Sequence, residues 1–184
     1  MIETDKKSAI AALNAEIAQC TGCELSTTRT RTVPGEGRPF VGPAGQFLDQ
    51  LLGSIGLRRP DVFIGNVIKC RPPQNQDPLP HQIRACENWL QRQLEIIEPK
   101  LVVTLGRYSM AKFFPGQSIS RIHGQVRRVG ELLVVPMYHP AAALHQGSLR
   151  RTIEDDFKKL PPVLKSALDD KKEPALETQQ MKLF

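Results

Sequence analysis

Three stretches of the chain repeat apolar residues at the spacing of one helix face, and we expect helices there. They cover residues 6–19, residues 43–56 and residues 80–98. Pro43 at the start and Gly56 at the end of the second stretch are typical of helix boundaries. The apolar positions are Ile10, Leu13 and Ile17, then Phe47, Leu48, Leu51, Leu52 and Ile55, and finally Ile83, Cys86, Leu90, Leu94 and Ile97.

Three other stretches are short, rich in β-branched residues and almost continuously apolar. They are DVFIGNVIKC at residues 61–70, KLVVTLG at residues 100–106 and ELLVVPMYH at residues 131–139. Such runs are typical of strands that are buried on both faces of a parallel sheet. Their alternation with helices predicts an α/β fold, a three-layer α/β/α sandwich with a short, mainly parallel central sheet. Sites in such folds form beyond the carboxyl ends of the strands.

The length of 184 residues suits one domain, which we place at residues 1–160. From residue 161 the chain becomes polar and charged, so we expect a flexible C-terminal tail at residues 161–184. No segment has the apolar run of a signal peptide or a membrane span, which predicts a cytoplasmic protein. The net charge of +6 and the pI of about 9.3 are compatible with a partner that has a phosphate backbone.

The four cysteines indicate a metal centre. Cys20 and Cys23 form a CxxC pair, and Cys70 and Cys86 follow at wide, irregular spacing. Disulfides are rare in cytosolic proteins. Zinc ribbons usually bring two close pairs, whereas iron-sulfur clusters are held by four thiolates at irregular spacing. The spacing therefore favours a cluster over zinc, and zinc over separately buried cysteines, a reading that stays open above all for Cys86 on its apolar helix face.

Polar residues at the ends of the predicted strands are candidates for binding. Asn66 lies in the first strand, where its amide either ties backbone together or matches a base edge with one donor and one acceptor. Uracil offers O4 and N3–H, and cytosine reverses this pattern, so a fixed asparagine would separate the two bases. His139 follows the third strand and either caps a helix or donates to a developing anion. Lys69 and Arg71, beside a Pro-Pro turn, suit a DNA phosphate or a solvated loop.

Four motifs, CTGC, GRPFVGPAG, GNVIKCRPP and YHPAAALH, occur in this order. Through them the chain resembles the family 4 uracil-DNA glycosylases, the iron-sulfur, thermostable-type branch of the superfamily, over most of its length. The resemblance implies the uracil-DNA glycosylase-like form of the sandwich and a 4Fe-4S cluster with a structural role. The cluster ligands that it implies are Cys20, Cys23, Cys70 and Cys86.

The resemblance also implies roles at a substrate site. Phe40 would stack on a flipped-out uracil, Asn66 would read its edge, and His139 would stabilise the leaving uracil anion through O2. The segment after His139 resembles the minor-groove wedge of the family, with Leu144 as the plug. The implied phosphate contacts of this segment are Arg150 and Arg151. The implied activity is that of a monofunctional glycosylase, which releases uracil from DNA and leaves an abasic site for base excision repair.

The chain departs from the family where Gly37 runs directly into Arg38. In the family, a turn resembling VPGEG leads to an apolar strand that is normally central, and then to a GEAPG-like loop associated with positioning the attacking water. In this chain no replacement for that loop is evident, and Glu36 is merely the carboxylate nearest to its place in the sequence. Because a sheet without its central strand leaves backbone groups unpaired, we expect the molecule to contain residues that this sequence omits. The alternatives are a catalytically impaired iron-sulfur DNA-binding relative and a structural zinc protein.

The last five residues, QMKLF, resemble the bacterial sliding-clamp-binding motif. Gln180 would form a hydrogen bond at the rim of the clamp's pocket. The clamp's apolar groove would bind Met181, Leu183 and Phe184. The alternative is an apolar end that folds back on the domain. We expect a monomer whose partners are uracil-containing DNA and, through this motif, the clamp.

Overall fold

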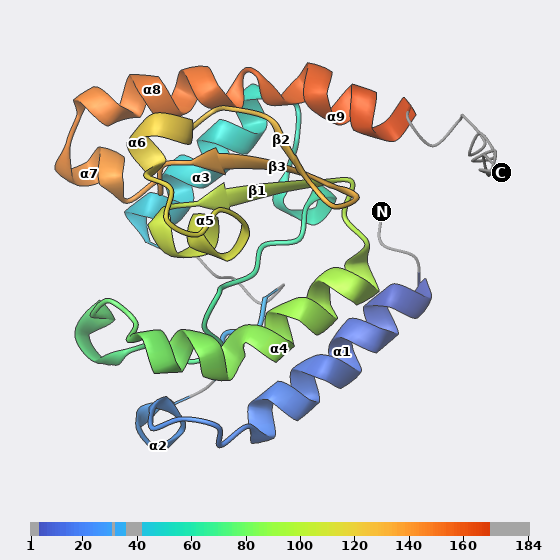
Figure 1. The fold of residues 1–184 in the computed structure, drawn as a ribbon, viewed down its shortest axis with the longest axis vertical. Coiled ribbons are helices and arrows are strands. Elements are labelled where there is room, and N and C mark those ends of the chain that lie inside the picture. Colours follow the sequence, from blue (N-terminus) through green and yellow to red (C-terminus); the bar gives the residue numbers. More distant parts are fainter. Residues whose placement is uncertain (1–3, 31, 36–41, 170–184) are drawn as a thin grey trace, which may run out of the picture.

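The computed structural model describes residues 4–30, 32–35 and 42–169 (Figure 1). The strands are β1 (Leu101–Leu105), β2 (Arg127–Val129) and β3 (Leu132–Met137). The helices are α1 (Thr4–Gln19), α2 (Leu25–Thr28), α3 (Pro43–Ser54), α4 (Pro80–Ile97), α5 (Arg107–Phe113), α6 (Ile119–Ile122), α7 (Ala142–His145), α8 (Ser148–Phe157) and α9 (Leu160–Asp169), with 3-10 turns at Arg59–Asp61 and Pro73–Asn75. The three helices expected from the apolar spacing are therefore confirmed as α1, α3 and α4.

The sheet described has three strands in the order β1-β3-β2. β1 and β3 are parallel, with Val103 opposite Val135, and they confirm the strands predicted at residues 100–106 and 131–139. β2 pairs with β3 in the antiparallel sense. It was not predicted, because its sequence, RRV, is short and polar and forms an edge of the sheet rather than its buried centre.

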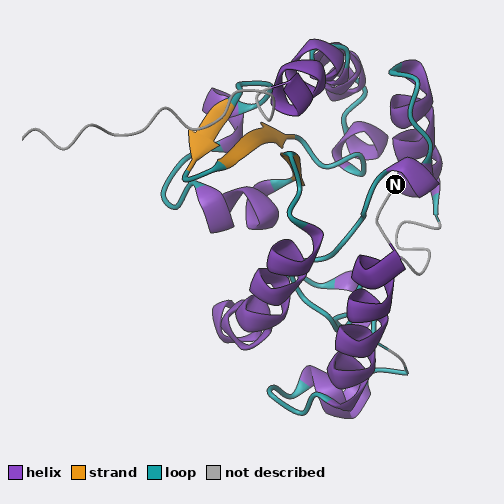
Figure 2. Ribbon diagram, turned by 90° about the vertical axis from the view of Figure 1, so that its right-hand side faces the viewer, coloured by secondary structure: helices purple, strands orange, loops and turns teal. Residues whose placement is uncertain are grey.

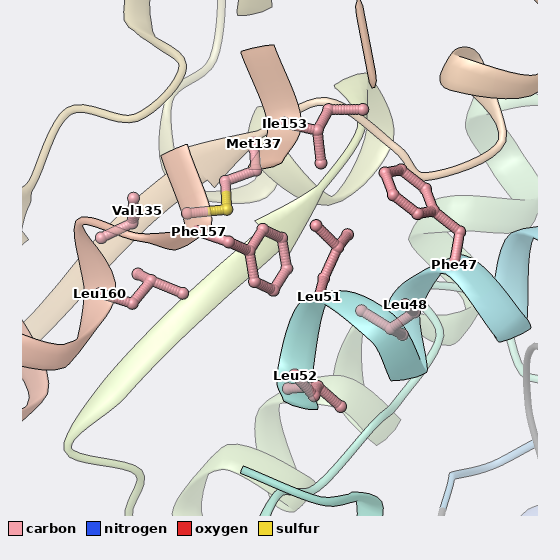
Figure 3. Packing of buried hydrophobic residues seen from close by; sticks show 9 residues of the cluster. All are labelled: Phe47, Leu48, Leu51, Leu52, Val135, Met137, Ile153, Phe157 and Leu160. Atoms are coloured by element: carbon pink, nitrogen blue, oxygen red, sulfur yellow. The ribbon is translucent and has the colours of Figure 1, made fainter. Parts of the chain in front are cut away.

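Alternate residues of β3 enter two hydrophobic clusters on opposite faces of the sheet. Val135 and Met137 pack with α3, α8 and the start of α9 (Figure 3), and Val134 packs with α5 and α6. Each large apolar side chain that is fully buried contributes roughly 1.5–3 kcal/mol to folding. The larger cluster consists of Phe47, Leu48, Leu51, Leu52, Val135, Met137, Ile153, Phe157 and Leu160. Helices on both faces of a mainly parallel sheet make the predicted α/β sandwich.

Helices α1 and α4 lie side by side beside the sheet and its covering helices (Figures 1 and 2). Glu16 of α1 accepts hydrogen bonds of 2.6 and 2.8 Å from the guanidinium of Arg92 on α4. The apolar face of α1 is fully buried, as its spacing predicts. This helix pair matters for the site, because Cys20 follows α1, Cys23 precedes α2 and Cys86 lies on α4.

The strand predicted at residues 61–70 is wrong. A 3-10 turn ends at Asp61, and the rest of the segment, Asn66 included, has no strand; its backbone makes one isolated antiparallel bridge, between Cys70 and Thr32. An apolar run becomes a strand only beside a neighbour that completes its hydrogen bonds. In the family that the sequence resembles, a central strand is expected beside this segment. This chain has no sequence for that strand. The join after Gly37 itself lies outside the described residues.

The C-terminal prediction needs one correction. The flexible tail was expected from residue 161, but Leu160–Asp169 form α9, and Leu160 and Ala167 are buried. The charged residues after position 161 predict a tail, but the apolar residues between them recur at helical spacing. The candidate clamp motif, with Gln180, Met181, Leu183 and Phe184, lies outside the described residues. Among the helices described, none has the length and apolarity needed to cross a membrane.

Candidate functional site

His139 lies at the carboxyl edge of the parallel strand pair, two residues after β3. β1 ends at the same edge, because Leu105 pairs with Met137, and the Gly106 N–H donates to the Met137 oxygen at 2.8 Å. Gly106 has φ +89, and a Cβ built on it would lie 3.0 Å from the Cβ of His139. The close approach of Gly106 to His139 therefore depends on glycine. The glycine that ends the apolar run at residues 100–106 is a signal in the sequence for this close approach.

The protonation of His139 follows from its surroundings. The backbone N–H of Ala141 donates to Nδ1 at 3.1 Å, so Nδ1 is the acceptor and the proton of the neutral ring sits on Nε2. Burial lowers the pKa of His139 from its ordinary value, which favours the neutral ring at neutral pH. The strand edge thus presents a neutral imidazole with an Nε2–H donor. Such a group stabilises an oxygen on which negative charge develops.

Asn66 lies in an irregular, half-buried segment. Its Nδ2 donates to the Val33 oxygen at 3.4 Å. If the amide flipped, Oδ1 would face that carbonyl oxygen, and two acceptors would oppose each other. The bond uses one of the two N–H groups, so the other N–H and Oδ1 can act together on a base edge. The segments of Asn66 and His139 both border the larger hydrophobic cluster, through Ile64 and Tyr138.

Lys69 is buried, which argues against the predicted phosphate contact of this residue. Its exposed fraction is 1%, and its ammonium donates to the Asn66 backbone oxygen and to Gln93 Oε1, both at 2.6 Å. Burial lowers the Lys69 pKa to about 8, and the nearby Cys86 opposes that shift. Arg71 differs, because it is exposed and donates to Asn75 Oδ1 at 2.7 Å. Sequence alone carries no signal that distinguishes these two cations.

The expected wedge segment forms helices α7 and α8 after His139. Leu144 on α7 is 49% exposed, similar to Leu79 and Leu168 elsewhere in the described chain. Arg150 on α8 lies 4.3 Å above the ring of Phe47, donates to Glu154 at 3.0 Å and donates to Gln50 at 3.0 Å. Arg151 has a side chain that is 91% exposed and a long, 3.9 Å ion pair with Asp155. Of the two arginines, Arg151 is the more accessible to a phosphate.

The four cysteines are free thiols, and three of their sulfur atoms accept N–H hydrogen bonds. Cys86 Sγ accepts from the Lys69 backbone at 3.3 Å, Cys70 Sγ from Arg29 at 3.1 Å, and Cys20 Sγ from Trp89 Nε1 at 3.4 Å. Trp89 and Cys86 are one turn apart on α4, so Cys20 lies beside the helix that carries Cys86. Neither Arg29 nor Trp89 is marked by its place in the sequence, because only the fold brings these residues to the cysteines.

The surroundings of Cys86 link it to two other cysteines. Burial raises the pKa of the Cys86 thiol, and charge on Cys23 and Cys70 raises it further. Electrostatic coupling of this kind acts over short distances. Among the described residues, no group of three or more His, Cys, Asp or Glu side chains is arranged to hold a single metal ion. A four-iron cluster is larger than one ion and takes its thiolates from farther apart.

These features define an α/β protein with a hydrogen-bond donor at the carboxyl edge of its sheet and a cysteine group beside it. Comparison with known families identifies it: the model of the uracil DNA glycosylase superfamily matches residues 25–164, and the chain belongs to this superfamily. It is 40% identical to the type-4 uracil-DNA glycosylase of Archaeoglobus fulgidus, over 88% of this chain and 94% of that protein.

Two further type-4 uracil-DNA glycosylases give similar results. Identity is 41% for the protein of Sulfurisphaera tokodaii, over 80% of this chain and 81% of the relative. Identity is 36% for the protein of Thermotoga maritima, over 83% of this chain and 93% of that relative. The alignment with the Archaeoglobus protein runs over 191 residues, more than the 184 residues of this whole chain. Some positions of that relative therefore have no counterpart here, in line with the predicted missing segment.

Proposed function

We propose that this protein is a monofunctional uracil-DNA glycosylase, which hydrolyses the N-glycosidic bond of a flipped-out deoxyuridine and leaves an abasic site in DNA. The observation that carries the proposal is the position of His139 at the strand edge, where the Ala141 N–H donates to Nδ1 and leaves Nε2 as the donor of the neutral ring. It occurs in a chain that aligns with 94% of a type-4 uracil-DNA glycosylase. A catalytically impaired DNA-binding protein is the less favoured reading, because the residues implied for binding the substrate and the cluster are all present.

The substrate base must leave the duplex before it can react. Extrusion costs a few kcal/mol, and less where uracil opposes guanine than in a good pair. We assign Leu144, which is exposed on α7, as the plug that enters the vacated stack. Arg151, and Arg71 farther away in sequence, are the proposed phosphate contacts, with Arg150 as a third once its internal bonds exchange. Phe40, the proposed stacking partner of uracil, lies outside the described residues.

Asn66 is the proposed reader of the extruded base. Its Nδ2–H would donate to uracil O4, and its Oδ1 would accept from N3–H. Cytosine places a donor where uracil has O4 and an acceptor where uracil has N3–H, so both contacts would become repulsive. The bond from Nδ2 to the Val33 oxygen supports the orientation that this reading needs. Selectivity for uracil thus depends on an amide that does not rotate.

His139 is the proposed catalytic residue. As the bond between C1′ and N1 breaks, its electron pair moves onto uracil and negative charge develops on O2. A neutral Nε2–H donor placed at O2 contributes about 3 to 4 kcal/mol by analogy with an oxyanion hole. Water then adds to C1′, and the proton that it loses balances the charge of the uracil anion. Glu36, the nearest carboxylate to the missing water-positioning loop, lies outside the described residues.

A 4Fe-4S cluster is the cofactor that the family implies, and the cysteine group fits it. Four thiols are free, and N–H groups of Lys69, Arg29 and Trp89 donate to three sulfur atoms, as hydrogen-bond donors around thiolate ligands do. The proposed ligands are Cys20, Cys23, Cys70 and Cys86. When bound, the cluster would tie α1, α2 and α4 to the segment that carries Asn66.

Base release tests the proposal. Protein with its cluster intact is incubated with an oligonucleotide that contains one uracil, and alkali then cuts any abasic site. We expect cleavage by the wild type and its loss in His139→Ala. Tight binding to uracil-containing DNA without release by the wild type would instead favour the impaired DNA-binding protein. A protein that lacks visible absorption after anaerobic purification would count against the cluster.

The remaining assignments are predictions about partners and location. We propose that residues 180–184 bind the bacterial sliding clamp, because QMKLF has the glutamine and apolar anchors of its binding motif. Deleting these residues should abolish clamp capture in a pull-down, and unchanged capture would refute the assignment. A monomer in the cytoplasm is the expected working form.

A further inference from the structure

The Lys69 ammonium and the Gln93 amide form a buried hydrogen-bond network that the chemistry proposed above does not use. Lys69 and Gln93 each have an exposed fraction of 1%. The Lys69 ammonium donates to the Asn66 oxygen and to Gln93 Oε1, both at 2.6 Å. Gln93 uses its other end to donate from Nε2 to the Pro34 oxygen at 2.7 Å. A charge in such a position is tolerated only while its partners hold it, so the network favours one geometry.

The network reaches the Asn66 side chain as well as its backbone. Asn66 Nδ2 donates to the Val33 oxygen at 3.4 Å, and the Val33 N–H donates to the Lys69 oxygen at 2.8 Å. Val33 is therefore held by Lys69, and the next residue, Pro34, is held by Gln93. Gly35 continues this close packing, because a Cβ built on it would lie 2.6 Å from Phe63 Cζ. Residues 33–35 are thus fixed against the segment that carries Asn66.

We propose that Lys69 and Gln93 are positioning residues for base recognition, which hold Asn66 and its partner Val33 so that the Asn66 amide keeps one orientation. The inference rests on the proposed function, since it concerns the uracil that Asn66 would read. Neither residue is placed to read the base itself. Both act through Asn66, and Lys69 also links this site to the cysteine group through its N–H bond to Cys86.

The need for such support follows from the chemistry of the two bases. Uracil and cytosine differ at this edge by an exchange of donor and acceptor, so a rotated amide would prefer the wrong base. The bond that opposes rotation is long, at 3.4 Å, and it depends on the position of the Val33 oxygen. A displacement of about 1 Å in a positioning group costs on the order of a hundredfold in rate.

The test compares two buried glutamines of α4. Gln93 and Gln82 are both buried, and Gln82 also uses both ends of its amide, with Glu24 at 2.6 Å and the Leu79 N–H at 2.9 Å. We expect Gln93→Leu to slow single-turnover uracil release at least about tenfold. Gln82→Leu should release uracil at the wild-type rate. Both variants should bind a duplex that carries a tetrahydrofuran abasic analogue as the wild type does, because that DNA has no base to read.

A double-mutant cycle with Asn66→Ala decides whether Gln93 acts through Asn66. If it does, Asn66→Ala and Asn66→Ala with Gln93→Leu will release uracil at the same reduced rate. Additive losses would overturn the inference, and so would a Gln93→Leu variant as fast as Gln82→Leu. If Gln93→Leu does not fold, Gln93→Glu replaces it: the carboxylate keeps an acceptor for Lys69 but repels the Pro34 oxygen, and it should slow release similarly.

The wild-type control separates this inference from the proposed function. Uracil release by the wild type, together with additive losses in the cycle, would overturn the role of Lys69 and Gln93 alone. No release by a wild-type protein with an intact cluster would overturn the proposed function, and the inference with it.

Discussion

The substitution Gly106→Ala would move His139, the proposed catalytic residue, without altering it. Gly106 follows β1 with φ +89 and ψ 175, a conformation that is open essentially to glycine alone. An added Cβ would also meet the Cβ of His139 at 3.0 Å, closer than ordinary van der Waals contact. The His139 backbone cannot recede freely, because β3 is paired with β1 up to the residue before Gly106.

The two effects of this substitution have different magnitudes. The backbone conformation should lower the free energy of unfolding by about 1–3 kcal/mol. The contact with His139 should displace Nε2 by a few tenths of an ångström and weaken the bond to uracil O2 that we propose for it. If half of the roughly 3 to 4 kcal/mol that such a donor contributes is lost, uracil release slows by more than about tenfold.

Single-turnover release of uracil, measured below the melting range of the variant, tests this prediction. Gly116→Ala is the matched control, because Gly116 also has a positive φ, +74, but a Cβ there would meet no atom within 4 Å. We expect the control to lose stability and keep its rate of release. A Gly106→Ala protein that is destabilised and yet releases uracil at the wild-type rate would refute the placement of His139 as the donor.

Three further predictions concern other groups. Protonation of His139 at Nδ1 would break the bond from the Ala141 N–H that orients the ring, and burial lowers the pKa of His139. Release should therefore stay constant through neutral pH and fall only below the usual histidine range near pH 6.5; a decline that begins above pH 7 in a pH–rate profile would contradict this. Arg29→Met should shift the reduction potential of the proposed cluster to a more negative value, since Cys70 loses a charged donor at 3.1 Å, while Arg29→Lys should shift it less; equal potentials in protein-film voltammetry would exclude the contact. Asp156→Ala should lower the free energy of unfolding by about 3 kcal/mol, because this buried carboxylate bonds His123 at 2.6 Å and Lys159 at 2.7 Å; an unchanged denaturant midpoint would show the pair to be neutral.

Local pattern was sufficient for part of the fold. The apolar spacing of α1, α3 and α4 and the continuous apolar runs of β1 and β3 predicted these elements, because a helix or a buried strand must turn its apolar side chains toward a core. The same reasoning failed at residues 61–70, where an equally apolar run forms no strand. Strand formation depends on a neighbouring backbone, and a single segment carries no record of whether that neighbour exists.

The candidate site divides in the same way. The sequence by itself determined the chemistry that is present: four thiols, an amide that can match a base edge, and a histidine at the end of a strand. Only the tertiary structure decided which polar groups reach water. It buried Lys69 against Asn66 and Gln93 and left Arg71 exposed, two residues farther along the chain. The physical reason is that burying a charge requires acceptors at hydrogen-bond distance, and here they come from residues up to 24 positions away, which only folding brings together.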